Sequence, residues 1–373
     1  MKNSFKKVIV IIKQAILTVC YAIKIGLIKL YKTIEVFRRG RRNKNAFAQK
    51  IGECRLNDEQ KEQVKNQYGK YYRFPLKQTD VFHRFYYEKT GVFSEKYLPD
   101  DLHYCRIDPF YNNWDEAKIL DNKCLYSRLF PGTLQPQTVA GRMNGVWTDA
   151  SFEMISEEKL LSLISNAGAV VIKEATESEG GHGVHFAEDC SSASEAIKQI
   201  QGDIIIQKVI KQHGELNRLN ESSVNTIRII SLLSKDKVKI YSSILRMGIN
   251  GSKVDNASSG GITCGITDKG RLKPIAYATN GTKYDAHPTS KVKFDDIVVP
   301  SFDKAKELVL KLHPYIPNFR LISWDIAINE EAEPVLIEAN LCYGELDFHQ
   351  LNNGPLFGED LDMILEEVFG EKK

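Results

Sequence analysis

Residues 321–340 read LISWDIAINEEAEPVLIEAN, two apolar runs separated by the turn segment 330–334. Apolar runs on either side of a polar segment that contains proline predict an antiparallel β-hairpin. With the turn centred between Glu331 and Ala332, Asp325 lies directly opposite Glu338. The hairpin is therefore expected to bring two carboxylates together on neighbouring strands.

Side chains alternate between the two faces of a strand, so the hairpin has two distinct faces. One face is wholly apolar and is expected to face the core; it comprises Trp324, Ile326, Ile328, Val335, Ile337 and Ala339. The opposite face comprises Ser323, Asp325, Ala327, Leu336, Glu338 and Asn340. Both carboxylates and one amide thus share the polar face.

Two opposed carboxylates on one sheet face repel each other. With Cβ atoms about 5 Å apart and an effective dielectric constant of about 20, the repulsion is roughly 3 kcal/mol. The hairpin carries no Lys or Arg on that face, so a divalent cation is expected to relieve the repulsion. Two carboxylates and the amide oxygen of Asn340, without His or Cys, suit Mg²⁺ better than zinc. A solvated hairpin face with scattered acids is the alternative interpretation.

The charge of the chain is distributed unevenly along its 373 residues. Residues 1–50 carry nine Lys, four Arg and one Glu, whereas the remainder carries 38 basic and 47 acidic residues. A basic head on an acidic body argues against a nucleic-acid partner and favours a local anionic partner of the head. The seven cysteines contain no C-x-x-C pair and are expected to be reduced thiols.

The basic head has the pattern of an amphipathic helix. Residues 8–31 are rich in Ile, Leu, Val and aromatic residues but are interrupted by Lys13, Lys24 and Lys29. At about 100° per residue, Lys6, Lys13 and Lys24 fall on nearly one line of a helix and leave a broad apolar remainder.

We therefore expect residues 1–45 to form a basic amphipathic helix that lies on an anionic membrane surface. The arginine cluster at 38–42 would add to the attraction. This predicts a cytoplasmic protein that is peripheral on the inner face of the cell membrane. A single membrane span, a cleaved signal peptide, and an oligomerising or lid helix are the alternatives.

The body is expected to contain an N-terminal lobe over residues 46–118, a lid or small subdomain over 119–215, and a metal and acceptor subdomain over 216–373. Helices are predicted at 58–68, 155–167 and 192–201, and strands at 138–140, 169–173, 184–186, 203–207, 224–233 and 237–247. Alternating elements followed by a strand-rich second half indicate a mixed α/β or α+β enzyme.

A glycine-rich turn at residues 180–183 separates two of the predicted strands and follows Lys173. Glycine lets backbone N–H groups approach phosphate oxygens closely, and Lys173 would supply a positive charge. Glycine-rich hairpins that bind nothing are common, and the segment matches neither the Walker loop nor the dinucleotide fingerprint.

Further motifs accompany this turn along the chain. They are FHRFY at 82–86, YLPDD at 97–101, DNK at 121–123, VIK at 171–173, the glycines of 180–183, SVNTIR at 223–228, RMG at 246–248, VDN at 254–256, GGI at 260–262, WD at 324–325, EAN at 338–340 and QLNNGPLFG at 350–358. Together they resemble the ATP-grasp superfamily, and most closely its sugar-transfer-associated branch, which is found alongside polysaccharide biosynthesis proteins. The similarity extends over residues 82–358.

The resemblance implies an ATP-grasp fold, in which two α/β lobes clamp a nucleotide, here with a helical N-terminal extension. It implies two lysines and a glycine loop on the phosphates, a hinge on the adenine edge, a triad that holds one or two Mg²⁺ ions, and cations that face the transferred phosphate or an acidic substrate. The residues are, for ATP, Lys123, Lys173, Gly180, Gly181, Gly183, Gln207, Lys208, Val209 and Ile210; for the metal, Asp325, Glu338 and Asn340; and for catalysis, Lys173, Arg228 and Arg246.

Four positions depart from the family pattern. Gln207 stands where the hinge usually has Glu, and Glu177 and Glu179 flank the phosphate loop where lysine or serine is usual. Ser323 stands two residues before Asp325, where ligases that join two D-alanines have arginine.

Members of the superfamily activate a carboxylate as an acyl phosphate, which an amine or thiol then attacks. The acceptor is expected to bind at residues 256–261 and 350–358, which are rich in amides, hydroxyls and glycines. The candidate residues are Asn256, Ser259, Gly260, Gly261 and Gln350. Two ordinary turns are the alternative interpretation.

The leading hypothesis is an ATP- and Mg²⁺-dependent carboxylate–amine ligase that acts on an envelope or exopolysaccharide sugar, or on its lipid-linked precursor. The first alternative is a kinase that phosphorylates a sugar or lipid head group. The second is a nucleotide-binding scaffold that performs no turnover and docks glycosyltransferases at the membrane.

Overall fold

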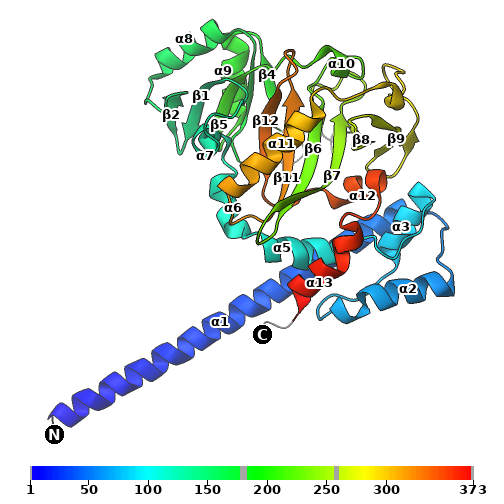
Figure 1. Ribbon diagram of the computed structural model, residues 1–373. Coiled ribbons are helices and arrows are strands. Elements are labelled where there is room, and N and C mark those ends of the chain that lie inside the picture. Colours follow the sequence, from blue (N-terminus) through cyan, green and yellow to red (C-terminus); the bar gives the residue numbers. More distant parts are fainter. Residues whose placement is uncertain (1, 177–182, 256–259, 371–373) are drawn as a thin grey trace.

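The computed structural model describes residues 2–176, 183–255 and 260–370, with side chains from residue 17 onward. Two sheets stand beside each other, and helices pack around them (Figure 1). A long N-terminal helix, α1 (Lys2–Lys50), projects from the body below the sheets in this view.

The smaller sheet has five antiparallel strands in the order β2–β1–β5–β3–β4. Its elements are β1 (Thr138–Met143), β2 (Val146–Asp149), α8 (Glu157–Ala167), β3 (Val170–Glu174), β4 (His185–Ala187), α9 (Cys190–Gln199) and β5 (Ile204–Lys208). Val170 and Ile172 of β3 pack with Leu160 of α8 in an apolar cluster. The alternate residues Val171 and Lys173 therefore point to the opposite face.

The larger sheet has seven strands in the order β10–β9–β8–β7–β6–β11–β12. Its strands are β6 (Thr226–Leu233), β7 (Val238–Met247), β8 (Ile262–Ile266), β9 (Leu272–Ala278), β10 (Lys283–Tyr284), β11 (Leu321–Ile328) and β12 (Pro334–Asn340). Strands β6 and β11 are neighbours although about ninety residues separate them in sequence. This pairing joins the predicted hairpin to one side of the larger sheet, with β12 as the edge strand.

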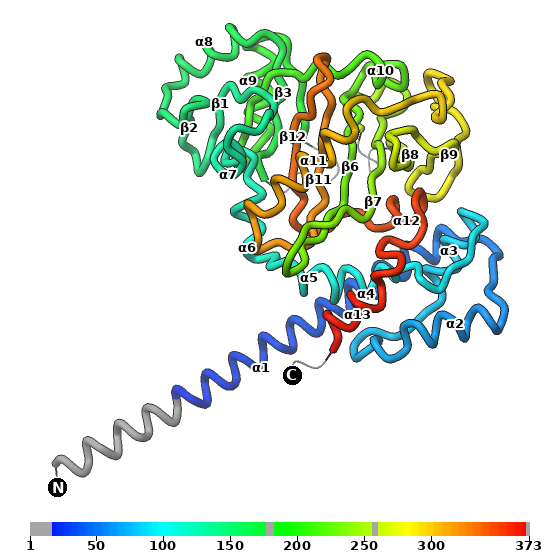
Figure 2. Tube along the Cα trace, viewed as in Figure 1, coloured from blue at the N-terminus to red at the C-terminus, as the bar shows by residue number. Residues whose placement is uncertain are grey.

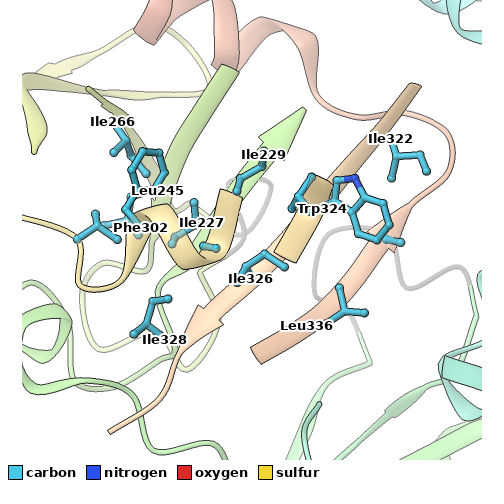
Figure 3. Packing of buried hydrophobic residues seen from close by; sticks show 14 of the residues in the cluster. Ile227, Ile229, Leu245, Ile266, Phe302, Ile322, Trp324, Ile326, Ile328 and Leu336 are labelled. Carbon is cyan, nitrogen blue, oxygen red and sulfur yellow. The ribbon is translucent and has the colours of Figure 1, made fainter. Parts of the chain in front are cut away.

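One face of the larger sheet packs on α11 (Phe302–Leu312) around a large apolar core (Figure 3). Helix α11 buries Phe302, Ala305, Val309 and Leu312, whose spacing of three and four residues places them on one side of the helix. Trp324 of β11 is completely buried here, and its indole N–H donates a hydrogen bond to Ser231 Oγ at 2.9 Å.

The other face of the larger sheet packs against helices from both ends of the chain. Leu98, Leu102 and Ile107 cluster there with Ile230 of β6 and Leu321 of β11. The remaining helical elements are α2 (Asp58–Tyr68), η1 (Gly69–Tyr71), α3 (Val81–Thr90), α4 (Asp100–Leu102), η2 (His103–Ile107), α5 (Asp108–Tyr111), α6 (Trp114–Leu120), η3 (Lys123–Leu125), α7 (Tyr126–Leu129), α10 (Gly214–Asn217), η6 (Phe294–Asp296), η7 (His313–Tyr315), α12 (Leu346–Asn353), η8 (Gly358–Asp360) and α13 (Leu361–Phe369).

The C-terminal part of α1 belongs to the body rather than to the projecting arm. Phe47 is buried with Phe82 and Phe85, and Gly40 lies against the side chain of Leu76, where a larger residue would collide. This packing explains why the helix continues to Lys50, past the predicted domain boundary at residue 45.

The predicted elements of the body are present with small shifts of their ends. Helix α2 occupies the predicted residues, and Asn57 caps it with Gln60 in a reciprocal capping box. The other two predicted domain boundaries fall inside short helices, α6 and α10. Among the described residues, no helix combines the length and the apolar composition needed to cross a bilayer.

The hairpin has the predicted pairing at its polar end and a different one near its turn. Asp325 lies opposite Glu338, as expected, but Ile326 lies opposite Leu336 because a β-bulge shifts the register. Leu336 is therefore completely buried in the core, and Ile337 is half-buried and lines a cavity. The predicted faces of these two residues are wrong, because strict alternation does not allow for an extra residue.

This exchange of faces predicts unequal effects of two similar substitutions. Leu336→Ala is expected to lower the free energy of unfolding by about 2–5 kcal/mol, because it leaves a cavity in the core. Ile337→Ala should lower the free energy of unfolding by less than about 1 kcal/mol, since that side chain already borders the cavity. Urea unfolding of both variants measures the difference. Equal losses, or a larger loss for Ile337→Ala, would contradict the bulged register.

Candidate active site

A cavity of about 520 Å³ lies between the two sheets, within the range of small-molecule sites. The smaller sheet contributes Val171, Lys173, Phe186 and Gln207 to its wall, and the larger sheet contributes Thr226, Arg246, Asp325, Ile337 and Glu338. Segments 207–212, 221–224 and 253–255 and the side chain of Lys123 line the remainder. Nine of the site residues predicted from separate parts of the sequence therefore meet in one place.

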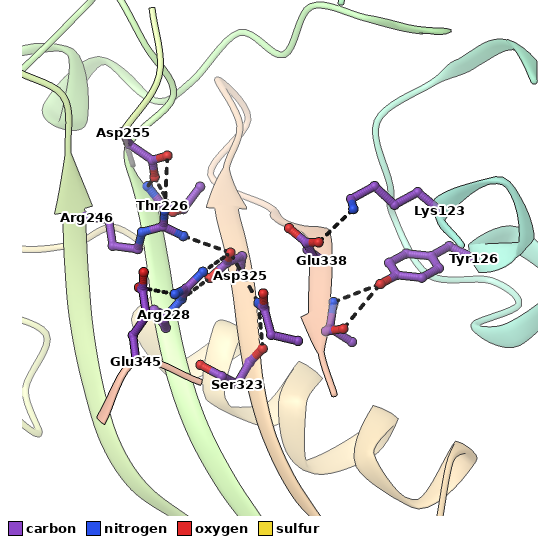
Figure 4. Close-up of polar contacts among 12 residues, drawn as sticks. Lys123, Tyr126, Thr226, Arg228, Arg246, Asp255, Ser323, Asp325, Glu338 and Glu345 are labelled. Carbon is purple, nitrogen blue, oxygen red and sulfur yellow. Dashed lines mark hydrogen bonds and ion pairs between the residues drawn. The ribbon is translucent and has the colours of Figure 1, made fainter. Parts of the chain in front are cut away.

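Asp325 lies at the floor of this cavity between two arginines (Figure 4). Arg228 stands opposite it on β6 and donates from Nε to Oδ1 and from Nη2 to Oδ2, each at 2.7 Å. Arg246 on β7 donates from Nη1 to Oδ2 at 2.9 Å. Arg228 also donates from Nη1 to Glu345 Oε2.

These arginines set the charge of Asp325. Burial acts to raise the pKa of its carboxyl group, but Arg228 and Arg246 outweigh burial and lower the pKa to about 2. The expectation that no Lys or Arg relieves the repulsion at the hairpin is therefore wrong. It considered the two hairpin strands alone, and the neighbouring strands β6 and β7 supply the cations.

Glu338 has its own cationic partner, the buried Lys123, whose Nζ lies 2.7 Å from Glu338 Oε1. Burial acts to lower the pKa of Lys123, but Glu338 and other acids outweigh it and raise the pKa. The neighbouring Asn122 donates from Nδ2 to Asp203 at 2.8 Å, and Lys123 N donates to Ala175 O at 2.8 Å. The backbone of Lys123 is thus held by the smaller sheet, whereas its ammonium group pairs with a carboxylate of the larger sheet.

Lys173 enters the cavity from β3, at the end of the smaller sheet that faces Lys123. Burial and the nearby Lys123 ammonium lower the pKa of Lys173 to about 8. Part of the Lys173 population is therefore uncharged near neutral pH, and an anion in the cavity would favour the charged form.

The predicted hinge lies at the wall of the cavity where β5 ends. Gln207, Lys208, Val209 and Ile210 all line the cavity. Gln207 is buried, and its Nε2 donates to Pro136 O at 3.5 Å. This amide therefore points partly toward the backbone of the smaller sheet.

The predicted metal triad of Asp325, Glu338 and Asn340 is assembled at the polar end of the hairpin. Asn340 lies opposite Ser323, and its Nδ2 donates to Ser323 O at 3.0 Å and to Asp325 Oδ2 at 3.4 Å. In the described part of the chain, no group of three or more His, Cys, Asp or Glu could hold a metal ion. Two carboxylates and an amide oxygen still match the ligand preference of Mg²⁺, and a cation at Asp325 would replace at least one guanidinium contact.

The glycine loop and part of the predicted acceptor site fall largely outside the described residues. Gly180, Gly181, Asn256 and Ser259 are not described. Gly183 is described and has a φ of +81°, which a residue with a side chain rarely adopts. Gly260 is exposed and Gly261 is buried just before β8, and neither lines the cavity.

Gln350, also predicted to bind the acceptor, is placed elsewhere. Its side chain is completely buried. Its Oε1 accepts a hydrogen bond from Leu98 N at 2.8 Å, and its Nε2 donates one to Leu98 O at 3.0 Å. The same oxygen accepts a hydrogen bond from Leu356 N at 3.3 Å. Gln350 therefore fastens α12 to the segment before α4, and the prediction that it contacts substrate is wrong for this structure.

Asp255 is a charged residue of the cavity that was not among the predicted site residues. It accepts hydrogen bonds from the backbone N–H of Thr226 at 3.2 Å and from Thr226 Oγ1, and its Oδ1 lies 3.8 Å from Arg246 Nη2 (Figure 4). Arg246 thus stands between Asp255 and Asp325. Asp255 follows β7 in an irregular segment, where neither spacing nor alternation predicts a position.

A comparison with protein families identifies the chain. The family model described as sugar-transfer associated ATP-grasp matches residues 104–364. The chain belongs to this family, and it has the expected mixed α/β fold with N-terminal helices. ATP-grasp enzymes are typically ATP-dependent ligases.

Solved structures resemble the chain more distantly. They include the biotin carboxylase domain of 2-oxoglutarate carboxylase from Hydrogenobacter thermophilus, with 12% identity, a TM-score of 0.43, and coverage of 71% of this chain and 48% of that one. D-alanyl-alanine synthetase A from Vibrio cholerae has 14% identity and a TM-score of 0.40, with 68% and 64% covered. VanG D-Ala:D-Ser ligase from Enterococcus faecalis has 13% identity and a TM-score of 0.40, with 68% and 60% covered.

The chain thus spans between about half and two thirds of the length of these three structures. Comparison with curated proteins gave no match.

The lowered pKa of Lys173 predicts a pH dependence of stability. Between about pH 8 and 10.5 the unfolded state binds a proton at this site that the folded state has lost, so stability should rise with pH by up to about 1.4 kcal/mol per unit. Lys173→Met should remove this contribution. Urea unfolding of both proteins across this range gives the difference in free energy of unfolding, and a difference independent of pH would contradict the lowered pKa.

Proposed function

We propose that the protein is an ATP- and Mg²⁺-dependent ligase that joins a carboxylate to an amine through an acyl phosphate. The observation that supports this proposal is that the two hairpin carboxylates meet several cations at one cavity between the two sheets. Lys123, Lys173 and Arg246 line this cavity together with Asp325 and Glu338, and Arg228 pairs with Asp325 from β6. Transfer of a phosphoryl group onto a carboxylate brings anions together and needs this density of positive charge.

The roles of the residues follow from their positions. Segment 207–210 would border the base of ATP, and Lys123 and Lys173 would bind its phosphates. Asp325, Glu338 and Asn340 would hold Mg²⁺, which supplies further charge neutralisation at the phosphates. Arg228 and Arg246 would then be released in part from Asp325, and Arg246, which lines the cavity, would turn toward the anionic substrate.

The proposed reaction takes place in two steps. A carboxylate oxygen of the first substrate attacks the γ-phosphorus of ATP, the bond to the bridging oxygen breaks, and ADP leaves. The amine nitrogen then attacks the carbonyl carbon of the acyl phosphate, and phosphate leaves with one of the protons of the nitrogen. Because water would destroy the acyl phosphate, an interior cavity suits this chemistry.

Asp255 would receive the amine. It is a carboxylate in the cavity wall that lies apart from the hairpin carboxylates, on the far side of Arg246. An amine is mostly protonated at neutral pH and must lose a proton before it can attack. Asp255 would bind the ammonium group and accept that proton.

As the substrate class we propose an acidic or amino sugar of the cell envelope or of an exopolysaccharide, or its lipid-linked precursor. Support comes from the family description, which associates these ATP-grasp proteins with sugar transfer. Glycosyltransferases are then proposed as partners that supply or consume the sugar.

The site proposal predicts metal-dependent ATP binding that one conservative change removes. Calorimetry of the full-length protein should show ATP binding that requires Mg²⁺, and Glu338→Gln should weaken it at least about 10-fold through loss of a metal ligand. Glu333→Gln is a matched control on the same hairpin, because the Glu333 carboxylate pairs with Lys304 at the surface, away from the cavity. Equal binding by Glu338→Gln and the unmodified protein would refute the metal site.

Product analysis separates the ligase from its alternatives. The probe is hydroxylamine with a panel of amino acids and uronic acids, since hydroxylamine traps an acyl phosphate as a hydroxamate. The ligase should give ADP, phosphate and a hydroxamate. ADP with a stable phosphorylated product would indicate a kinase instead, and ATP binding without any product would indicate a scaffold.

The proposed role of Asp255 predicts that its replacement slows amide formation more than hydroxamate formation. Asp255→Asn should reduce amide formation from a protonated amine by about 100-fold or more, because the base is lost. Hydroxamate formation should change far less, since hydroxylamine is already uncharged near neutral pH. The ratio of the two rates, measured with the same carboxylate, is the readout. Equal losses with both nucleophiles would mean that Asp255 has only a structural role.

A further inference from the structure

The projecting part of α1 carries a continuous apolar stripe over residues 19–37. The stripe consists of Val19, Ile23, Leu27, Leu30, Ile34 and Phe37, and each of these residues is between 40% and 61% exposed. Their spacing of three or four residues places them on one side of the helix. An apolar surface of this extent, left in water, marks a site that a partner covers.

The remaining circumference of this segment indicates what kind of partner covers it. Tyr21, Ile25 and Ile28 lie away from the stripe and are also exposed, so apolar side chains occur on more than one side. A second α1 helix would cover one side only, whereas a helix that is buried about 5–10 Å into the head-group boundary of a bilayer is covered on its flanks as well. A helix pair therefore leaves part of the apolar surface in water.

The charges favour the same partner. Between residues 17 and 42 the helix carries Lys24, Lys29 and Lys32 and the arginine cluster at 38–42, with Glu35 as its single acid. Glu35 is already paired with Arg38, at 3.5 Å. Two such helices side by side would repel each other, whereas an anionic lipid surface would attract each of them.

The body adds an apolar side chain beside the base of this arm. Phe74 is 85% exposed, the largest exposed fraction among the large apolar side chains of the described residues. Its carbonyl accepts a hydrogen bond from Arg106 at 3.3 Å, and the neighbouring Cys105 lies against Val36 of α1, with Sγ at 3.7 Å from the Val36 carbonyl. Leu76, two residues further on, packs on Gly40.

We propose that the stripe of α1 and Phe74 together form a lipid-binding surface for an anionic bilayer. The helix lies along the interface with the stripe toward the acyl chains, and its basic side chains reach the phosphate head groups. Figure 2 shows the arm extending well beyond the body, so that its described part is free to lie on a surface. The inference does not rest on the proposed ligase activity.

Flotation of the full-length protein with vesicles tests this surface. The probes are phosphatidylcholine vesicles with about one third phosphatidylglycerol, and vesicles of phosphatidylcholine alone. The unmodified protein should float with the anionic vesicles, and high salt should weaken binding. Leu27→Glu/Leu30→Glu should lower the partition coefficient at least about 10-fold, because two carboxylates then enter the apolar layer.

Further variants separate the contributions of the apolar and the basic side chains to vesicle binding. Met154→Glu introduces the same chemical change at a residue that is 80% exposed on the smaller sheet, and it should leave binding unchanged. Lys24→Glu/Lys29→Glu should weaken binding to anionic vesicles and not to neutral ones. Phe74→Ser should lower the partition coefficient by about threefold, since one aromatic side chain is lost.

Two results would overturn the proposal. One is unchanged flotation of the Leu27→Glu/Leu30→Glu variant, with ATP binding as a check that the body is folded. The other is sedimentation of the unmodified protein as a stable dimer that does not float, together with a monomeric Leu27→Glu/Leu30→Glu variant. That second result would assign the stripe to another copy of the chain.

Discussion

A carboxylate buried between two arginines organises the larger sheet. Burying an ion costs several kcal/mol unless partners surround it, so each charge in this group requires the others. Asp325 satisfies Arg228 and Arg246, and the two guanidinium groups extend the network to Glu345 and Asp255. Strands β6, β7 and β11 and two loops thereby share one electrostatic unit, and the cavity takes its floor from it.

This arrangement has a consequence for ligand exchange. At the floor of the cavity, Asp325 pairs with its two arginines and Glu338 pairs with Lys123. A polyphosphate that enters with a divalent cation offers new partners to both members of each pair. The cation would take the carboxylates and the phosphates would take the lysines and arginines, so that neither pair would leave a buried charge without a partner. Binding would then require little change in backbone position.

The sequence predicted the local elements of this fold better than the contacts between them. The assumed centre of the turn placed Asp325 opposite Glu338, although the pairs next to the turn have a centre half a residue earlier. The extra residue of the bulge compensates for this offset, so the pairing of Asp325 with Glu338 is nevertheless the predicted one. The bulge itself, at Ile337, has no sequence signal, and it reversed the expected faces of Leu336 and Ile337.

The arginines on Asp325 were individually predicted, but their partner was not, because β6 and β11 become neighbours only in the folded sheet. Asp255 was missed as a site residue for a similar reason: it lies in an irregular segment that only tertiary structure brings to the cavity.

The base of α1 is attached to the body close to the half of the molecule that contains the cavity. The Arg39 guanidinium lies 4.3 Å from the centre of the Trp114 ring and 5.5 Å from that of Tyr343, and it donates to Tyr104 O at 3.2 Å. Tyr343 is two residues from Glu345, which pairs with Arg228. A continuous helix held in this way does not act as a flexible tether, which would let the body tumble freely. It acts as a stiff lever, so any surface that captured the arm would also fix the direction in which the mouth of the cavity points.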